Sequence, residues 1–349
     1  MKAKELVPIV LEALRNNVDV ESVKTQYSIS EEVWHRVSEK VYSQNLELSR
    51  KERLEDQVKS NVSCTELATI DQMFEAVNFL ASKALCLPTT VTLYQYEQVN
   101  SFRHREYFDE KALILFIEKL VMSPKMRAHQ KLGRFKHYPV FQSFVKYIDS
   151  ALTCYYRKNY QSCFLTLAPI IEGVLLKWLG YRKGDTKPKF DELKKFFRNG
   201  HRRNPCPGNP LFYHLYAKAC DEILSNHFYL NSGQGLAYGS FNRHLASHML
   251  TDDQFATKDN CIRLFVLIDT MTELYLYETC CNDPRFYLKH EEVVGDYMAY
   301  SRLMLEGESK DSLEMALLQD NANNKFRSDS QRSASSVQAI LAFMAQWFR

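Results

Sequence analysis

The chain has 349 residues and exceeds the roughly 100–200 residues of one ordinary domain, so we expect two or three domains. Its composition, 45% hydrophobic and 25% charged, excludes a globally disordered protein. Only 11 Gly and 10 Pro are present, and this scarcity of turn residues favours long helices over many short strands. We therefore predict an all-α fold, in which a smaller helical N-terminal domain precedes an antiparallel multi-helix bundle.

The nine cysteines follow no metal-binding or disulfide pattern. Cys280 and Cys281 are adjacent and no CxxC pair occurs, so we expect no zinc or other metal site, no disulfide framework and no cofactor. The N-terminus lacks a signal-peptide pattern, and no run of about 18 apolar residues is present. These features predict a cytoplasmic protein without a membrane partner.

Residues 1–45 predict three short helices that form a module resembling a helix-turn-helix. The third helix follows a tight break at residues 28–30, where Ser30 is placed to cap it. In a helix-turn-helix the last helix enters a DNA groove. Its exposed side would present His35, Arg36 and Lys40. Three acidic residues share that side and would repel phosphate, so a small module that binds another protein is the alternative.

Residues 46–130 predict a helical connecting region. The polar stretch 44–61, with mixed charges, is typical of an exposed helix or a linker. A helix is expected over Glu66–Leu85. Thr89–Val99 is predicted to be a loop, because its β-branched and aromatic residues have no evident partner strand. Asp109–Leu120 is apolar almost all round, which indicates a helix buried between others.

Residues 131–285 predict an antiparallel bundle of four main helices. Two of them lie within Tyr138–Tyr181, separated by a turn at Asn159, and the other two cover Leu211–Leu230 and Lys258–Cys281. Residues 286–318 predict a helical extension, and residues 319–336 a flexible linker rich in Asn, Ser, Asp and Gln. Residues 337–349 carry one apolar face, typical of an amphipathic helix that docks on the body, on a second copy or on a partner.

A concentrated basic segment separates the second and third helices of this bundle. Residues 177–203 hold ten Lys and Arg against three acids, a local net charge of +7 in a chain whose net charge is +3. A polyanion-binding face needs such a segment, although a solvated helix face has the same composition. The candidate RNA-binding residues are Lys187, Lys189, Lys194, Lys195, Arg198, Arg202 and Arg203.

An arginine and a histidine lie five positions apart in the stretch from Gly239 to His248. On a helix, Arg243 and His248 would project to nearly the same side, with Asn242 and His244 flanking the arginine. Glu172 is a lone acid in an otherwise apolar helix. It is predicted to be either a surface residue or the ionic partner of Arg243.

The same spacing occurs again at Arg285 and His290, and about two matches are expected by chance in a chain of this composition. The second pair has Phe286 directly after the arginine and follows Pro284, beyond the last predicted helix of the bundle. The polar neighbours and flanking helices of Arg243 therefore favour the first pair as the functional one.

The region 138–279 resembles the HEPN superfamily of helical nucleases. The HEPN signature is an arginine, a polar residue, and a histidine roughly four to six residues after the arginine. Arg243, His244 and His248 match it, and Thr257–Leu264, leading into a long apolar helix, resembles one bacterial branch. Members of that branch commonly have Gly after the histidine, where this chain has Met249.

The resemblance implies a four-to-five-helix bundle that cuts RNA without a metal, paired as a homodimer about the motif face, in a toxin or antiphage effector. RNA supplies its own nucleophile, the 2′-hydroxyl, so cleavage needs a base, an acid and a cation for the phosphorane. His248 would move protons, Arg243 would grip the phosphate, and His244 and Asn242 would orient the substrate or Arg243. The alternative is a noncatalytic HEPN-like domain for dimerisation or binding, in a DNA-binding regulator or a defence-complex scaffold.

Overall fold

The computed structural model describes residues 3–16, 18–60, 65–88, 91–182, 184–230, 241–243 and 255–323, without the side chains of residues 54, 56–60, 65–68 and 310–323. Helices and their connections make up all the described ranges, which contain no strand, as the sequence predicted. Within the same ranges, no helix combines the length and apolarity needed to cross a bilayer. The helices are α1 (Ala3–Arg15), α2 (Val20–Gln26), α3 (Glu31–Ser60), α4 (Thr65–Ala81), α5 (Leu93–Arg103), α6 (Glu110–Val121), α7 (Pro124–Gln130), the π-turn η1 (Lys131–Phe135), α8 (Pro139–Gln142), α9 (Val145–Tyr156), α10 (Tyr160–Trp178), α11 (Phe190–Lys194), α12 (Gly200–Arg203), α13 (Pro210–Ile223), the π-turn η2 (Leu224–Phe228), α15 (Lys258–Thr279), the 3-10 turn η4 (Pro284–Tyr287) and α16 (His290–Asn323).

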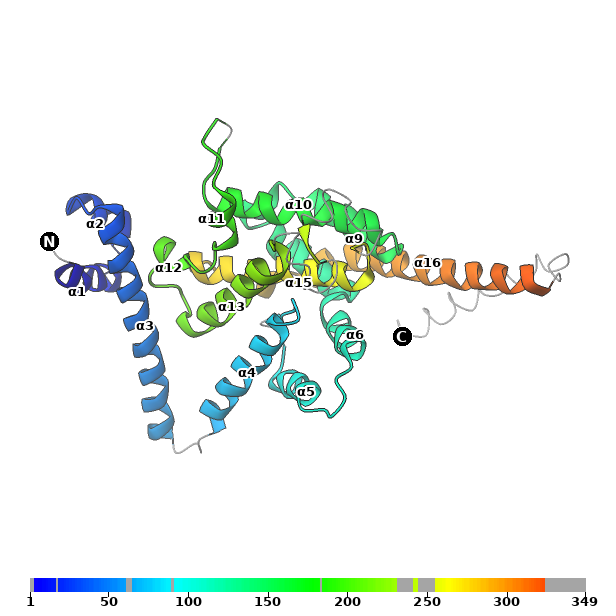
Figure 1. The fold of residues 1–349 in the computed structure, drawn as a ribbon, viewed down its shortest axis with the longest axis horizontal. Helices are drawn as coiled ribbons and strands as arrows, with labels where there is room; N and C mark the ends of the chain where they lie inside the picture. Colours follow the sequence, from blue (N-terminus) through cyan, green and yellow to red (C-terminus); the bar gives the residue numbers. More distant parts are fainter. Residues whose placement is uncertain are drawn as a thin grey trace.

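The N-terminal helices α1, α2 and α3 form a module with its own small core at one end of the molecule (Figure 1). Trp34, Val37 and Val41 of α3 pack there against apolar residues of α1 and α2, as their spacing predicted. α3 continues without a break to Ser60, so the predicted boundary at residue 45 falls inside a single helix. The stretch 44–60, predicted as helix or linker, is helix.

The segment predicted as a loop over Thr89–Val99 contains the start of α5, and that prediction was wrong from Leu93 onward. The Gln95 side chain accepts a hydrogen bond from the backbone N–H of Thr92 at 2.7 Å, which favours a helix start. Tyr96, Val99 and Phe102 then recur every three residues and are buried. This helical period outweighs the strand preference of the individual residues.

α15 is the centre of the larger body, and nearly all of its first 17 residues are buried. α10 and α13 pack against it, and α9 packs along α10 (Figure 1). Asn159 caps α10 by accepting a hydrogen bond from the Ser162 N–H at 3.1 Å, where the sequence predicted the turn. The helices predicted over the two halves of Tyr138–Tyr181, over Leu211–Leu230 and over Lys258–Cys281 are therefore present as α9, α10, α13 and α15.

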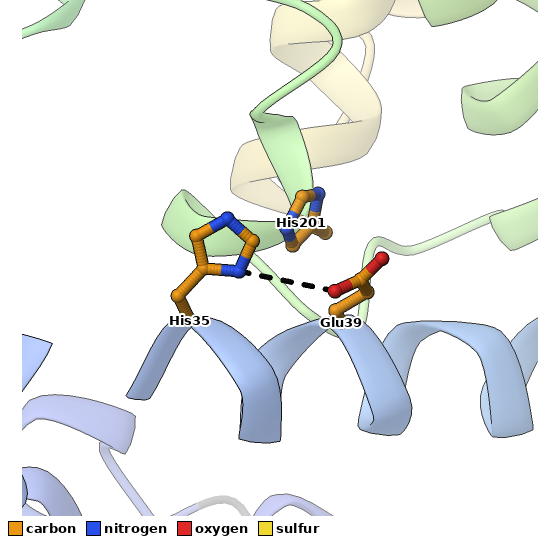
Figure 2. A group of neighbouring side chains, drawn as sticks. All are labelled: His35, Glu39 and His201. Carbon is orange, nitrogen blue, oxygen red and sulfur yellow. Dashed lines mark ion pairs between the residues drawn. The ribbon is translucent and has the colours of Figure 1, made fainter. Parts of the chain in front are cut away.

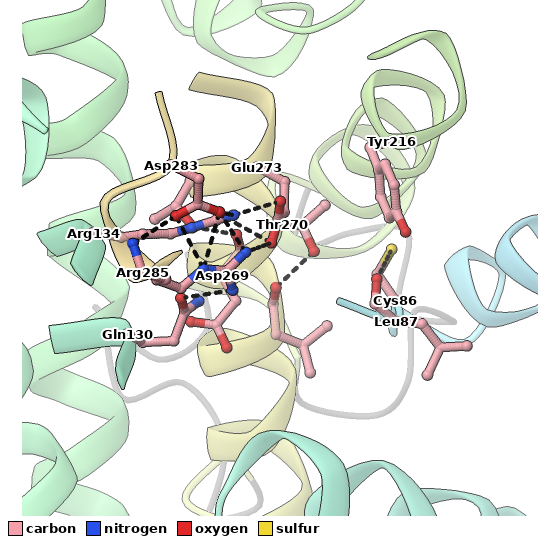
Figure 3. A network of polar contacts seen from close by, with 12 residues as sticks. Cys86, Leu87, Gln130, Arg134, Tyr216, Asp269, Thr270, Glu273, Asp283 and Arg285 are labelled. Atoms are coloured by element: carbon pink, nitrogen blue, oxygen red, sulfur yellow. Dashed lines mark hydrogen bonds and ion pairs between the residues drawn. The ribbon is translucent and has the colours of Figure 1, made fainter. Parts of the chain in front are cut away.

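A charge network that no sequence pattern indicated is buried beside α15 (Figure 3). Arg134 contacts Glu273 and Asp283, each at 2.6 Å, and its side chain is 0% exposed. Arg285 contacts the same Asp283 at 2.7 Å. Burial alone would raise the pKa of Asp283, but the hydrogen bonds and charges of the two arginines lower it to about 2.

A second buried ion pair, between Arg127 and Asp269, lies one turn earlier on α15. Together with Arg134, Arg285, Glu273 and Asp283, it gives three cations and three anions. The cluster is neutral as a whole. Its members lie on η1, α7, α15 and the region of the turn η4 after α15, so their contacts join these segments.

α16 runs along α7 and α9 and then extends away from the body (Figure 1). It contains most of the helical extension predicted over residues 286–318 and continues to Asn323, five residues into the predicted linker. The remaining residues of that linker and the predicted C-terminal helix over 337–349 lie outside the described residues.

Replacing Gly307 with Ala is expected to destabilise the protein by about 1–3 kcal/mol. A Cβ at Gly307 would collide with the carbonyl oxygen of Tyr156, where α16 crosses the end of α9. Gly295 on the same helix has nothing within 4 Å of an added Cβ. Gly295→Ala should therefore raise helix stability by up to about 1 kcal/mol. Urea unfolding of both variants measures the difference, and equal effects at the two positions would contradict the close packing at Gly307.

Candidate active site around Arg243

Phe241 and Asn242 hold the backbone that leads into the motif. Phe241 is buried against Phe164 of α10 and Phe228 of η2, with ring centroids 6.4 and 5.7 Å apart. The Asn242 side chain is buried, and its amide donates a hydrogen bond to the carbonyl oxygen of Leu230 at 2.6 Å. Asn242 thus anchors the chain immediately before Arg243 rather than facing solvent.

Arg243 forms the ion pair with Glu172 of α10 that the sequence offered as one of two alternatives. Its guanidinium also lies over the ring of Tyr229, 5.9 Å from the centroid. Burial raises the pKa of Tyr229, with the charge of Glu172 adding to the effect, so this ring is a neutral platform. The Arg243 side chain remains 30% exposed, so an anion can still approach it.

Lys187 contacts the same carboxylate from the other side, with its Nζ 2.7 Å from Glu172 Oε1. The Glu172 side chain is only 10% exposed, whereas that of Lys187 is 59% exposed. Two cations on one carboxylate leave a net positive charge where the side chains reach solvent. We call this group of Glu172, Arg243 and Lys187 the Arg243 cluster.

The two histidines of the motif, His244 and His248, lie outside the described residues. Their distance from Arg243, and their proposed parts in proton transfer and orientation, therefore remain predictions. The described part of the motif consists of Phe241, Asn242 and Arg243.

Some of the predicted RNA-binding residues are exposed, and others form ion pairs within the protein. Lys189, Lys195 and Arg202 are exposed, and Lys194 is half-buried. Arg198 is exposed but donates two hydrogen bonds to Asp221 Oδ2, at 3.0 and 2.7 Å. Lys187 belongs to the Arg243 cluster.

Arg203 has a structural role that its place in the basic segment concealed. It donates to both carboxylate oxygens of Glu278, at 2.7 and 3.0 Å, and to the backbone carbonyl of Phe196 at 2.9 Å. Tyr213 and Trp178 donate to the same carboxylate at 2.6 and 3.0 Å. This network holds α12 against α15, so the guanidinium of Arg203 is already engaged and is not part of an RNA-binding surface.

The three residues predicted to read DNA differ in their surroundings. His35 packs edge-on against the ring of His201 from α12, with centroids 5.2 Å apart, and its side chain is 33% exposed, so only part of it faces the open side of α3. Arg36 pairs with Glu32 at 2.6 Å and remains 65% exposed. Lys40 is exposed and, with Arg36, lines a cavity of about 810 Å³ between α1 and α3. α3 is therefore covered on two sides, which leaves less of it to enter a groove.

The second Arg–His match is explained by the fold. Arg285 is 10% exposed, and its guanidinium contacts Asp283 and Glu273 within the buried charge network. The guanidinium of Arg285 is therefore engaged inside the protein. Comparisons of this chain with protein families, with curated proteins and with solved structures found no match.

Proposed function

We propose that this protein is a metal-independent endoribonuclease of the HEPN type, acting as a toxin or antiphage-defence effector. The observation that carries the proposal is the Arg243 cluster. It holds a partly exposed guanidinium between a buried carboxylate and an aromatic ring, with a second cation beside it. A guanidinium fixed in this way can donate two parallel hydrogen bonds to a phosphate.

The proposed reaction uses the 2′-hydroxyl of the RNA as nucleophile. A base removes the 2′-hydroxyl proton, the 2′-oxygen attacks the adjacent phosphorus, and the 5′-oxygen leaves as it accepts a proton from an acid. The products are a 2′,3′-cyclic phosphate and a free 5′-hydroxyl. Arg243 stabilises the charge that builds up on the phosphorane, and His248 transfers the proton.

One copy of the chain supplies a single His248, whereas the reaction needs both a base and an acid. We therefore include a homodimer about the motif face in the proposal, with His248 of each copy taking one of the two roles. His244 orients Arg243 or the substrate. The exposed residues Lys189, Lys195 and Arg202 guide the polyanion toward the cleft between the copies.

Incubating the purified protein with total RNA in EDTA tests the proposal. We expect cleavage that leaves 2′,3′-cyclic phosphate ends and that falls by about 100-fold or more in His248→Ala. His290→Ala is the matched control, because His290 belongs to the second Arg–His match and is exposed. It should cleave at the wild-type rate.

Intact RNA across varied substrates would overturn the proposal and leave the noncatalytic alternative. In that case the helical body would serve for dimerisation or binding, in a DNA-binding regulator or a defence-complex scaffold. A DNA mobility shift that is lost in Arg36→Ala and Lys40→Ala would then favour the regulator.

A further inference from the structure

Three side chains able to bind a metal converge where the N-terminal module meets the body (Figure 2). His35 and Glu39 lie one turn apart on α3, and His201 approaches from α12. One ligand atom from each of the three lies within 4.8 Å of the others. His35 Nδ1 and Glu39 Oε2 are 3.9 Å apart. These residues have no part in the Arg243 cluster, and more than 160 positions of sequence separate the two halves of the group.

We infer that His35, Glu39 and His201 form a binding site for a divalent transition metal ion, and that Zn²⁺ is this ion. The bound ion links α3 to α12. Two imidazoles and a carboxylate are a common three-ligand set for zinc, with water in the fourth position. Tetrahedral coordination with bonds of about 2.0–2.1 Å places ligand atoms about 3.3 Å apart. Side-chain rotations that shorten the present separations by up to about 1.5 Å are therefore enough.

His201 offers one ring nitrogen that a metal could use. Its Nε2 atom is buried and has no hydrogen-bond partner among the described residues. Histidine ligands usually direct one ring nitrogen at the metal, while the other donates its N–H to a carbonyl or a carboxylate.

The backbone of His201 is also fixed before any metal binds. Arg203, two residues later, is held by Glu278, and Gly200, one residue earlier, packs so closely on the Tyr213 hydroxyl that a Cβ would collide with it. On α3, Tyr42 follows Glu39 by three positions, and its ring lies 6.3 Å from that of His201. His35, Glu39 and Tyr42 therefore form one face of α3 turned toward α12.

A path for the ion is present as well. His35 and Glu39 border a cavity of about 650 Å³ that also contains Glu21, Glu31 and Glu32. The Glu39 side chain is 63% exposed, so the site opens to solvent on that side. The lining carries as many cations as carboxylates, because Lys24, Arg36, Arg202 and Arg203 accompany the four glutamates, and Lys24 and Arg36 pair with Glu31 and Glu32. Binding of the ion therefore depends on the three ligands themselves and not on the charge of the cavity.

Metal binding to the full-length protein tests this inference. The protein is stripped with a chelator and titrated with Zn²⁺ in a Cys280→Ser/Cys281→Ser background, because those adjacent, exposed thiols could themselves bind zinc. We expect one ion per chain and binding at least tenfold weaker in His201→Ala and in His35→Ala. His104→Ala, at an exposed position, is the control and should bind as the parent does.

Two further readouts keep the test decisive if a histidine variant fails to fold. Glu39→Gln changes an exposed side chain and should also weaken binding at least tenfold. At a Zn²⁺ concentration about a hundredfold above Kd, the midpoint of thermal unfolding should rise by about 3–4 °C in the parent and by less in Glu39→Gln. Unchanged affinity in the variants, or no binding by the parent, would overturn the site. RNA cleavage in EDTA depends on neither result, so this inference and the proposed function can fail separately.

Discussion

Replacing Arg134 with Leu is expected to lower the free energy of unfolding by about 3–5 kcal/mol. The change removes one cation from the buried charge network, in which Arg134 contacts Glu273 and Asp283. Two carboxylates then face only the guanidinium of Arg285, and burial leaves them with little help from water. Urea unfolding followed by circular dichroism measures the loss.

Two comparisons show whether the loss comes from uncompensated charge. Arg302→Leu removes an arginine that is 82% exposed and pairs with Glu306 on the same helix, and it should cost about 0.5 kcal/mol or less. Adding Asp283→Asn to Arg134→Leu should recover part of the stability, because it restores charge balance. A double variant whose loss equals the sum of the two single losses would contradict the network.

The pH dependence of the same variant has a definite sign. In the wild type, the lowered pKa of Asp283 contributes stability above the unfolded-state value, and this contribution is lost as the pH falls toward 2. Without Arg134 the pKa of Asp283 should rise, since burial is then opposed by Arg285 alone. The stability gap between wild type and Arg134→Leu should therefore narrow as the pH falls from about 7 to about 4.

The helices of the body could be predicted because their apolar residues recur with a helical period over long stretches. α10 and α15 are the clearest cases, since nearly every turn of each contributes to the core. α5 was missed because a β-branched run precedes it and Tyr94, Tyr96 and Val99 favour strands, although Leu93, Gln95, Glu97 and Gln98 favour a helix.

No sequence pattern of this kind indicates which residues far apart in the chain contact each other. Arg134 and Glu273 are 139 positions apart, and nothing in either neighbourhood indicates the other. The same limit applies to His35 and His201, whose contact places the predicted DNA-facing histidine against the body. Within the basic segment, composition does not separate Arg202, which is exposed, from Arg203, which is held by Glu278.

The pairing of Glu172 with Arg243 could be anticipated for a physical reason. A carboxylate within an apolar helix is costly to bury without a cation, and Arg243 was the candidate. What the sequence did not indicate is the second cation, Lys187, on the same carboxylate. Because Lys187 also compensates the charge of Glu172, the effect of an Arg243 variant on RNA cleavage can be measured apart from its effect on stability.

Arg243→Ala is expected to reduce RNA cleavage by about 100- to 1,000-fold while changing the free energy of unfolding by only about 1 kcal/mol or less. Cleavage falls because the phosphorane loses its guanidinium. Stability is largely kept because Lys187 still compensates Glu172, at 2.7 Å. Single-turnover cleavage rates and urea unfolding of the same preparations measure the two effects.

Arg243→Lys distinguishes charge from geometry at the same position. Lysine keeps the charge beside Glu172 but cannot grip a phosphate with two parallel hydrogen bonds, so we expect wild-type stability and at least about tenfold slower cleavage. Removing both cations in Arg243→Ala/Lys187→Ala leaves Glu172 buried without a partner. That double variant should lose more stability than the two single losses combined, by about 1–3 kcal/mol. If Arg243→Ala instead unfolds the protein as readily as the double variant does, Arg243 is a structural residue, because Lys187 then fails to compensate the carboxylate.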